Sequence, residues 1–230
     1  MPAPRLFTII PCAGSSTRLG FDKILTPLKN LSSLDLVLLS LKEAAKPFKT
    51  IIPVAPGREE EFIKKIHFPA TIIQGGACRA QSIKNALLEI AKDNPKPNDL
   101  ILIHDGARPF VESATIKKTI NAALETGAAI SALPVKDTIK EATKDCQFIA
   151  KTPPRQLLFA ATTPQIFSFE ILEKAYATKK DLSSFTDDAQ LIETELPEVK
   201  IKIVPDTPKN FKITTQEDWD FALWLISHAR

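Results

Sequence analysis

Short apolar runs alternate with longer amphipathic segments from residue 6 to residue 133. The apolar runs occupy residues 6–10, 50–55, 71–73, 100–103 and 128–133. They are too short to be buried helices, so each is a candidate β-strand. Between them apolar side chains recur three to four positions apart, as at Leu34, Val37 and Leu38, which is typical of a helix with one buried face. This alternation predicts an α/β fold with a mainly parallel sheet and a ligand site beyond the carboxyl ends of its strands.

The alternation is interrupted after Pro134. Residues 136–151 are rich in charge around one apolar centre at 147–150, and they have no helical stripe, so we predict a protruding hairpin. A helix near 169–177, a strand at 199–204 and a C-terminal helix from Thr215 are expected to follow. The length of 230 residues favours one domain, 1–230, with residues 136–158 as its excursion.

Composition excludes several classes of function. The 30 basic and 27 acidic residues give a net charge of +3, which lacks the basic footprint of a nucleic-acid-binding protein. No apolar run approaches the roughly 20 residues that span a bilayer, and the first residues lack the apolar region of a signal peptide. The three cysteines Cys12, Cys78 and Cys146 form no closely spaced pair. We therefore expect no membrane partner and a location in the reducing cytoplasm.

The scarce glycines point to three loops. The chain has only 7 glycines, and five of them lie in segments that follow predicted strands: residues 11–23, 74–82 and 104–109. These five are Gly14, Gly20, Gly75, Gly76 and Gly106. Because the strands are expected to run parallel, the three loops open on one edge of the sheet. We interpret these glycines as positions where the backbone comes close to a ligand.

The first loop is a candidate phosphate site. Its small residues leave backbone N–H groups accessible, Arg18 can contact two phosphate oxygens, and Lys23 supplies a mobile positive charge. The spacing matches neither a Walker A motif nor the GxGxxG or GxSxG patterns. From spacing alone, an ordinary strand-to-helix loop is an equally good interpretation.

The other two loops are also open to two interpretations. Gly75 and Gly76 can form a wall for a flat ring, although a plain turn before a helix explains them better in isolation. Asp105 can hold a metal ion or a sugar hydroxyl, or it can simply pair with Arg108. The three histidines are too scattered for a zinc site, and we favour a structural role for His104. Most aromatic residues fall in apolar stripes and are expected in the core.

Taken together, the loops resemble those of the 2-C-methyl-D-erythritol 4-phosphate cytidylyltransferases. The resemblance is carried by seven blocks in family order between residues 9 and 219: IIPCAGSSTRLGFDK, QGGACRAQSIKNAL, LIHDGARPF, ALPVKDTIK, RQLLFAATTPQIF, FTDDAQLIE and NFKITTQEDW. It implies a Rossmann-like three-layer nucleotidyltransferase fold with a protruding β-arm, a homodimer formed through that arm, and the use of CTP with Mg²⁺ or another divalent cation. It also implies transfer of CMP from CTP to methylerythritol phosphate by direct in-line attack, with release of pyrophosphate.

The resemblance also assigns roles to individual residues. Arg18 and Lys23 match the pair that stabilises the transition state. The residues that match the nucleotide site are Pro11, Cys12, Ala13, Gly14, Gly75, Gly76 and Ser82. The residues that match the substrate site are Asp105, which is also the candidate metal ligand, and Arg108, Thr138, Arg155, Thr163, Thr186 and Lys212. Thr138 and Arg155 flank the predicted arm and resemble residues that reach the neighbouring subunit's substrate.

Two alternatives stay open at this point. A cytidylyltransferase acting on ribitol 5-phosphate or a related polyol phosphate would share the loops and the arm. A nucleotide-binding regulatory module without catalysis is the alternative from another class, but the presence of Arg18 and Lys23 argues against it, because a sensor has no transferring phosphoryl group to stabilise.

Overall fold

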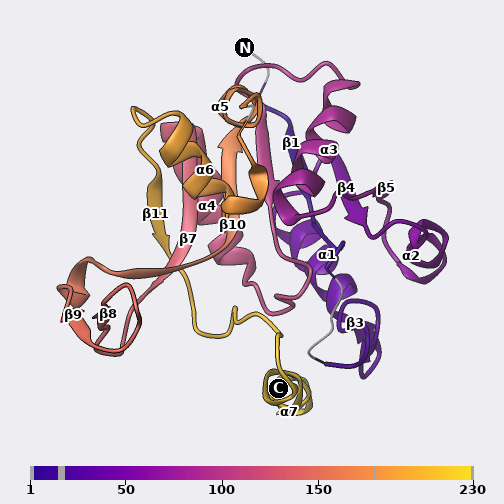
Figure 1. Cartoon of the computed structure of the whole chain (residues 1–230). Helices are drawn as coiled ribbons and strands as arrows, with labels where there is room; N and C mark the ends of the chain where they lie inside the picture. The colour runs from indigo at the N-terminus through magenta and orange to yellow at the C-terminus, as the bar shows by residue number, and fades with distance from the viewer. Residues whose placement is uncertain (1–2, 15–18, 179, 229–230) are drawn as a thin grey trace.

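A mixed sheet forms the centre of the protein. The computed structural model describes residues 3–14, 19–178 and 180–228, and in them a seven-stranded sheet has the order β11-β7-β10-β6-β1-β4-β5 (Figure 1). The strands are β1 (Leu6–Ile9), β4 (Lys49–Val54), β5 (Thr71–Gln74), β6 (Leu100–Ile103), β7 (Ala128–Pro134), β10 (Phe159–Ser168) and β11 (Lys202–Pro205). The predicted α/β class is confirmed, and the expected strand at 199–204 begins three residues later than predicted.

The sheet is mainly but not wholly parallel. β1 pairs in parallel with β4 and β6, β4 with β5, and β7 with β11. β10 is antiparallel to both of its neighbours, β6 and β7. The sequence analysis did not assign this strand. Its pairing with β7 shifts in register between Ala161 and Gln165, around Pro164, which has no N–H to donate to a ladder.

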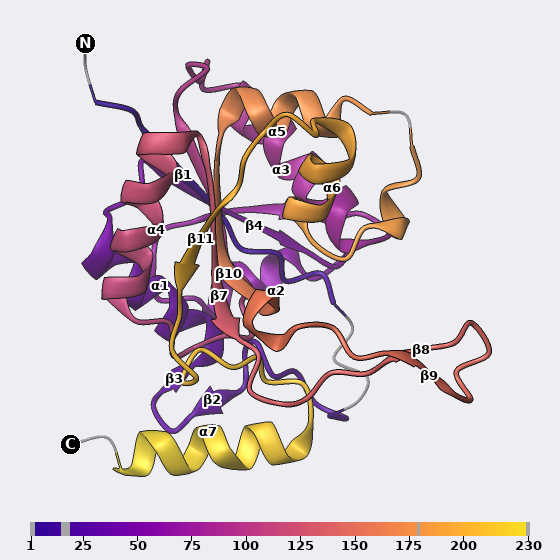
Figure 2. The ribbon, with the colours of Figure 1, turned by 90° about the vertical axis from the view of Figure 1, so that its left-hand side faces the viewer.

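Helices cover both faces of the sheet, so the fold has three layers. On one face lie α1 (Ser33–Ala44), α2 (Glu59–Lys65) and α4 (Ser113–Thr126), and on the other lie α3 (Arg79–Ala91), α5 (Phe169–Tyr176) and α6 (Asp188–Glu195). Figure 2 shows the sheet nearly edge-on, with α1 and α4 on one side and α3, α5 and α6 on the other. No helix among the described residues is both long and apolar enough to cross a bilayer.

Alternate residues of each strand enter opposite cores. In β1, Phe7 and Ile9 pack against α3 and α5, whereas Ile10, just past the strand, packs on the side of α1. The helices begin and end as their sequences dictate. In α1, the Ser32 hydroxyl accepts from the N–H of Asp35 while the Asp35 carboxylate accepts from the N–H of Ser32, a capping box. α4 ends at Gly127, whose φ of +77° favours glycine.

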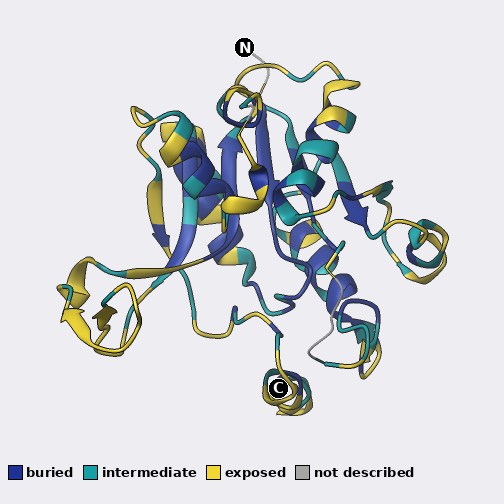
Figure 3. Cartoon of the chain, in the orientation of Figure 1, coloured by how far each residue is buried: buried dark blue, intermediate teal, exposed yellow. Residues whose placement is uncertain are grey.

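A hairpin projects from the body between β7 and β10. It contains β8 (Glu141–Ala142) and β9 (Ile149–Lys151), which pair antiparallel as a separate small sheet. Figure 2 shows it extending away from the layers, and Figure 3 shows it coloured as exposed along most of its length. Large apolar side chains on the hairpin and its base are left in solvent, namely Ile139, Phe148, Ile149, Leu157 and Phe159.

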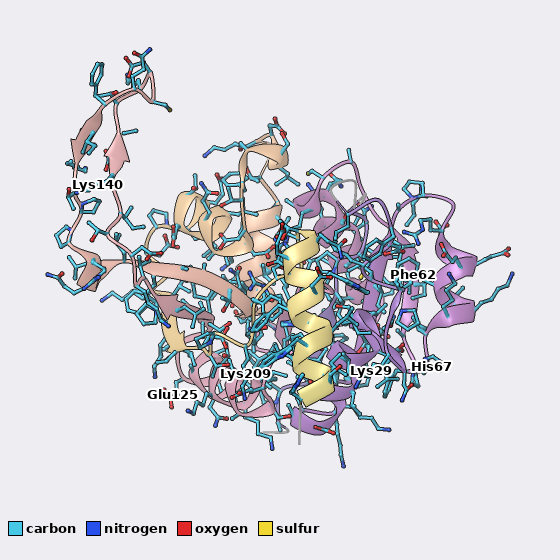
Figure 4. All side chains as sticks on the ribbon, turned by 90° about the horizontal axis from the view of Figure 1, so that it is seen from below. Lys29, Phe62, His67, Glu125, Lys140 and Lys209 are labelled. Atoms are coloured by element: carbon cyan, nitrogen blue, oxygen red, sulfur yellow. The ribbon has the colours of Figure 1, made fainter. Side chains whose placement is uncertain are left out.

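The C-terminal helix α7 (Gln216–His228) lies apart from both faces of the sheet. Seen from below in Figure 4, it crosses the underside of the body between Lys209 and Lys29. Its buried Trp219 and Ala222 form a small third cluster with Leu28 and Ile213. Leu28 belongs to β2 (Pro27–Leu28), which pairs with β3 (Leu31–Ser32) in the segment before α1. Helix α7 therefore packs against two segments that are far apart in sequence: the β2–β3 segment and the segment around residue 213.

Candidate active site

A cavity of about 550 Å³ opens at the carboxyl ends of the central strands. It is lined by Pro11, Cys12, Ala13, Gly14, Lys23, Ile24, Gly76, Ala77, Cys78, Arg79, Ser82, Asp105, Gly106, Ala107, Lys212 and Thr214. The described parts of all three loops meet here, as predicted. The segment before α7 adds Lys212 and Thr214. Parallel strand ends explain the meeting of the loops, because loops after such strands open on one edge of a sheet.

The first two loops are held together by close packing. A side chain at Gly75 would bring a Cβ atom within 2.8 Å of the Ala13 Cβ, 2.9 Å of the Ser82 hydroxyl and 3.0 Å of the Val54 carbonyl oxygen. Gly75 does not line the cavity. The missing side chain of Gly75 makes room for Ala13, and its contact with a nucleotide stays a prediction. The Ser82 hydroxyl accepts the N–H of Gly76 at 3.0 Å and fixes the loop from behind.

Asp105 is the centre of the charged groups in the cavity. Its Oδ2 lies 3.0 Å from Lys212 Nζ and 3.4 Å from Arg108 Nε, and its Oδ1 lies 3.7 Å from Arg79 Nε. Burial alone would raise the pKa of Asp105, but Lys212, Arg79 and Arg108 hold it well below its usual range. The carboxylate stays ionised at neutral pH, and the cavity wall keeps a surplus of positive charge suited to a phosphate-bearing ligand.

Arg79 is a residue for which the sequence analysis gave no role. It is the first residue of α3, and its guanidinium lies 2.7 Å from a carboxylate oxygen of the fully buried Asp188, at the start of α6. Tyr176 donates its hydroxyl to the other oxygen of Asp188 at 2.5 Å. Arg79 therefore lies between a buried carboxylate and the carboxylate of the cavity. Its place in the second glycine loop, residues 74–82, was the only sequence signal for it.

The family of the chain is decided by comparison with known proteins. The family model described as 2-C-methyl-D-erythritol 4-phosphate cytidylyltransferase matches residues 6–227. The chain belongs to this cytidylyltransferase family. It is 36% identical over 225 residues to the 2-C-methyl-D-erythritol 4-phosphate cytidylyltransferase of Alkaliphilus metalliredigens, covering 94% of this chain and 90% of that protein. It is also 36% identical to the protein of that name from Endomicrobium trichonymphae, covering 93% and 95% of the two chains.

Solved structures agree with this membership. The crystal structure of 4-diphosphocytidyl-2C-methyl-D-erythritol synthase from Anaerococcus prevotii superposes with a TM-score of 0.81 at 29% identity, covering 98% of this chain and 99% of that one. The 2-C-methyl-D-erythritol 4-phosphate cytidylyltransferase of Francisella tularensis superposes with a TM-score of 0.79 at 27% identity, covering 96% and 99%. The protein is therefore a nucleotidyltransferase, with the Rossmann-like fold expected from the resemblance.

Within this cytidylyltransferase, Lys23 lines the cavity and lies in a turn braced by its neighbour Asp22. The neighbouring Asp22 accepts the N–H of Ile24 at 2.8 Å through Oδ1, and its Oδ2 forms an ion pair with Arg58. Arg58 is fixed in turn by Glu61 at 2.8 Å. Arg18, the other residue predicted to stabilise the transition state, lies outside the described residues.

The remaining predicted substrate residues are not gathered around the cavity. Arg108 packs against Asp105 from behind, and the Thr163 side chain is buried beneath it, where it accepts the N–H of Asp105 at 3.1 Å. Thr186 is exposed before α6 and bonds to Gln190. The other two, Thr138 and Arg155, are exposed where the hairpin leaves the body, and Arg155 donates to the Lys136 carbonyl at 2.6 Å. These five positions stay predictions as ligand contacts.

Neither Cys12, which lines the cavity, nor the neighbouring His104 is an activated nucleophile. Burial, with Asp22 and Asp105 nearby, raises the pKa of the Cys12 thiol far above its usual range, so it is not a thiolate at neutral pH. Burial lowers the pKa of His104 to about 4, so this histidine is neutral. His104 is fully buried, and its structural role was anticipated. The described part of the site therefore fits chemistry in which the substrate supplies its own nucleophile.

Proposed function

We propose that the protein transfers CMP from CTP to 2-C-methyl-D-erythritol 4-phosphate, giving 4-diphosphocytidyl-2-C-methyl-D-erythritol and pyrophosphate. The observation that carries this proposal is the cationic wall around one ionised carboxylate, formed by Lys23, Arg79, Asp105 and Lys212, in a chain of this family. The activity named for the relatives from Alkaliphilus metalliredigens and Endomicrobium trichonymphae supports the same acceptor. They do not favour the ribitol phosphate enzyme or the non-catalytic module.

The reaction is a direct displacement. A phosphate oxygen of methylerythritol phosphate attacks the α-phosphorus of CTP, a new P–O bond forms, and the bond from the α-phosphorus to the bridging oxygen breaks as pyrophosphate leaves with that oxygen. The phosphate monoester is already largely dianionic at neutral pH, since its second pKa is about 6, so no strong general base is required. Lys23, with Arg18 in the proposed site, offsets the charge that develops on the phosphoryl oxygens.

The nucleotide is assigned to the side of the cavity formed by the first two loops. Ala13 and Gly14 lie opposite Gly76 and Ser82, and the close packing of Gly75 on Ala13 keeps this part narrow. A narrow backbone wall fits a pyrimidine ring and crowds a purine. The close packing of Gly75 on Ala13 and the hydrogen bond from Gly76 to Ser82 keep the wall in place before the nucleotide arrives, which favours a preformed site.

The acceptor is assigned to the side of Asp105 and Lys212. Asp105 can accept hydrogen bonds from the polyol hydroxyls, and Lys212 supplies a positive charge to the acceptor phosphate. Thr138 and Arg155 are not among the residues that line the described cavity. We propose that the hairpin forms a homodimer and brings both residues to the partner's acceptor phosphate. The exposed Phe148 and Ile149 support an interface there.

Mg²⁺ is proposed as the cofactor. Asp105 is the carboxylate that lines the described cavity, and its Oδ1 makes a long 3.7 Å contact with Arg79. One carboxylate oxygen together with substrate phosphates is a donor set typical of Mg²⁺ in nucleotide enzymes, so the residues fit the ion. Among the described residues no cluster of three candidate ligands occurs, so phosphates and water would complete the shell. When bound, the ion neutralises phosphate charge and orients the triphosphate.

We place the reaction in the cytoplasm, which the three free cysteines support. The proposed activity is tested by giving the purified protein CTP, Mg²⁺ and one acceptor at a time, and by measuring pyrophosphate release. We expect release with methylerythritol phosphate and at most a small rate with ribitol 5-phosphate. Rapid release with ribitol 5-phosphate and none with methylerythritol phosphate would overturn the assignment of the acceptor. Binding of CTP without release for any acceptor would favour a regulatory module.

A further inference from the structure

A closed circuit of hydrogen bonds lies beneath the floor of the cavity. We call it the buried circuit, and its members are His104, Arg108, Thr163 and Asn210. His104 Nε2 lies 3.2 Å from the Arg108 carbonyl oxygen, and Arg108 Nη1 donates to the Asn210 carbonyl at 2.8 Å. Asn210 Nδ2 donates to the Thr163 carbonyl at 2.7 Å, and the Thr163 hydroxyl lies 2.9 Å from His104 Nδ1. The circuit therefore joins the loop after β6, the strand β10 and the segment before α7.

The donors and acceptors of the circuit have only one consistent arrangement. The Arg108 carbonyl can only accept, so His104 Nε2 carries the proton. The Thr163 hydroxyl already accepts the N–H of Asp105 at 3.1 Å, and it donates its own proton to the unprotonated His104 Nδ1. The amide nitrogen of Asn210 faces two acceptors, the Thr163 carbonyl and Asp206 Oδ2, each at 2.7 Å. One tautomer of the histidine and one orientation of the amide are thus selected.

The circuit supports both charged groups of the acceptor side. Asp105 follows His104 directly, and its backbone N–H is bonded to Thr163. Lys212 follows Asn210 by two residues, and its Nζ meets Asp105 Oδ2 at 3.0 Å. Because the circuit ties the two segments together from below, it sets the spacing of Asp105 and Lys212 above. His104 and Asn210 are fully buried, and low local polarity strengthens such hydrogen bonds.

We propose that His104 is a positioning residue of the transferase, holding Asp105, Arg108 and Lys212 in register through the buried circuit. This inference rests on the proposed function. His104 does not line the cavity, so it acts on the reaction only through these neighbours. A displacement of about 1 Å in reacting or binding groups lowers a rate by on the order of 10²-fold, which makes a distant positioning residue kinetically visible.

Two variants of His104 and one of Thr163 separate the contribution of the imidazole ring from that of its hydrogen bonds. His104→Phe keeps an aromatic ring but removes both hydrogen bonds, whereas His104→Gln can keep the donor toward the Arg108 carbonyl. Thr163→Ser keeps the hydroxyl that links His104 to Asp105. The matched control is Thr8→Val, because Thr8 is fully buried in β1 and its hydroxyl has no hydrogen-bond partner in the described part of the chain.

The kinetic result expected is a selective loss. His104→Phe lowers kcat/KM for methylerythritol phosphate by about 10- to 100-fold, and His104→Gln recovers part of it. The dissociation constant for CTP changes by less than about threefold. The nucleotide is assigned to the first two loops, whereas the circuit joins the loop after β6, strand β10 and the segment before α7. Thr163→Ser loses less than His104→Phe because it keeps the linking hydroxyl, and Thr8→Val stays close to wild type. Equal losses in CTP affinity and in acceptor kinetics, or wild-type kinetics for His104→Phe, would overturn the proposal.

The tautomer provides a readout that needs no activity. Nitrogen NMR of the ¹⁵N-histidine-labelled wild-type protein is expected to show one of the three histidines with a protonated Nε2 and an unprotonated Nδ1, and the signal should be lost in His104→Phe. A protonated Nδ1 at His104 would break the circuit and overturn the proposal. A lack of product from the wild-type protein would instead count against the proposed function, and the tautomer would still decide on the circuit.

Discussion

Lys212 Nζ lies 3.0 Å from Asp105 Oδ2, which joins the segment before α7 to the loop after β6 across one wall of the cavity. The two residues are 107 positions apart in sequence, and the contact exists because the Ile213 N–H also donates to the Ala107 carbonyl at 2.9 Å. A backbone bond next to an ion pair fixes the position of the lysine. The acceptor side of the site is therefore built by two separate segments.

The first prediction concerns Lys212 itself. Lys212→Ala should lower kcat/KM for methylerythritol phosphate by on the order of 10²-fold, since a positive charge aimed at transferring phosphates is lost. The matched control is Lys209→Ala, three residues earlier in the same segment. The Lys209 side chain is exposed, and its Nζ makes a long contact of 3.9 Å with Glu112. Steady-state kinetics with varied acceptor compares the two variants. Equal losses of kcat/KM in both variants would show that the effect comes from disturbing the segment and not from removing the charge of Lys212.

Gly75 gives a prediction about the nucleotide wall. Gly75→Ala should weaken CTP binding by about tenfold or more and destabilise the fold by about 1–3 kcal/mol, because the added Cβ overlaps Ala13 and the Val54 carbonyl. The double variant Gly75→Ala with Ala13→Gly should recover part of the affinity, since it removes one of the overlapping atoms. Calorimetric titration with CTP measures both. An affinity unchanged by Gly75→Ala would refute the close packing of the two loops.

The third prediction tests the role of α7. Trp219 meets Phe21, two residues before Lys23, edge-on with ring centroids 4.8 Å apart. Trp219→Ala should therefore lower kcat by about tenfold and speed hydrogen exchange in residues 213–228, whereas Trp219→Phe should retain most of the activity. Trp224→Ala in the same helix is the control, because Trp224 is 53% exposed. If both alanine variants lose activity equally, α7 does not act through Trp219.

The pH dependence of kcat/KM should follow the ionisation of the acceptor phosphate and not that of Asp105. The pKa of Asp105 lies well below its usual range, so this carboxylate remains ionised, and its contribution to stability is lost only as the pH falls through that low pKa. The acceptor phosphate takes up a proton with a pKa of about 6. We expect kcat/KM for the acceptor to fall as the pH drops below about 6. A profile that stays flat down to about pH 5 would contradict attack by the dianion.

A mixing experiment tests whether the hairpin acts on the partner subunit. Arg155→Ala and Lys23→Ala should each be inactive or nearly so, and their mixture should regain activity, because one of the two shared sites then has both residues. Size and subunit exchange are followed by analytical ultracentrifugation and by mass labelling. The control is each variant mixed with itself. No recovery despite proven exchange would place Arg155 in the site of its own subunit or outside any site.

The sequence predicted the parts of the site that local patterns determine. Strands β1, β5 and β6 and the loops after them were predictable from short apolar runs followed by small and charged residues. β10 was not, because Pro164 stands inside it and prolines are rare in central strands; a register shift accommodates it. The structural role of His104 was predicted, but its partners were not, since Thr163 and Asn210 are far from it in sequence.

Long-range contacts also explain what was missed. Arg79 is one of 30 cations in the sequence, and only the folded chain shows it beside the buried Asp188. A sequence likewise does not reveal that Ala13 packs against Gly75.

The stereochemistry of the transfer shows whether the acceptor phosphate attacks CTP directly. The reaction would be run with CTP that carries sulfur on its α-phosphorus in one defined configuration, together with methylerythritol phosphate, and the configuration of the diphosphocytidyl product would be determined. Direct in-line attack by the acceptor phosphate predicts a single product with inverted configuration at that phosphorus. Retention would require a nucleotidylated protein intermediate and would contradict the account.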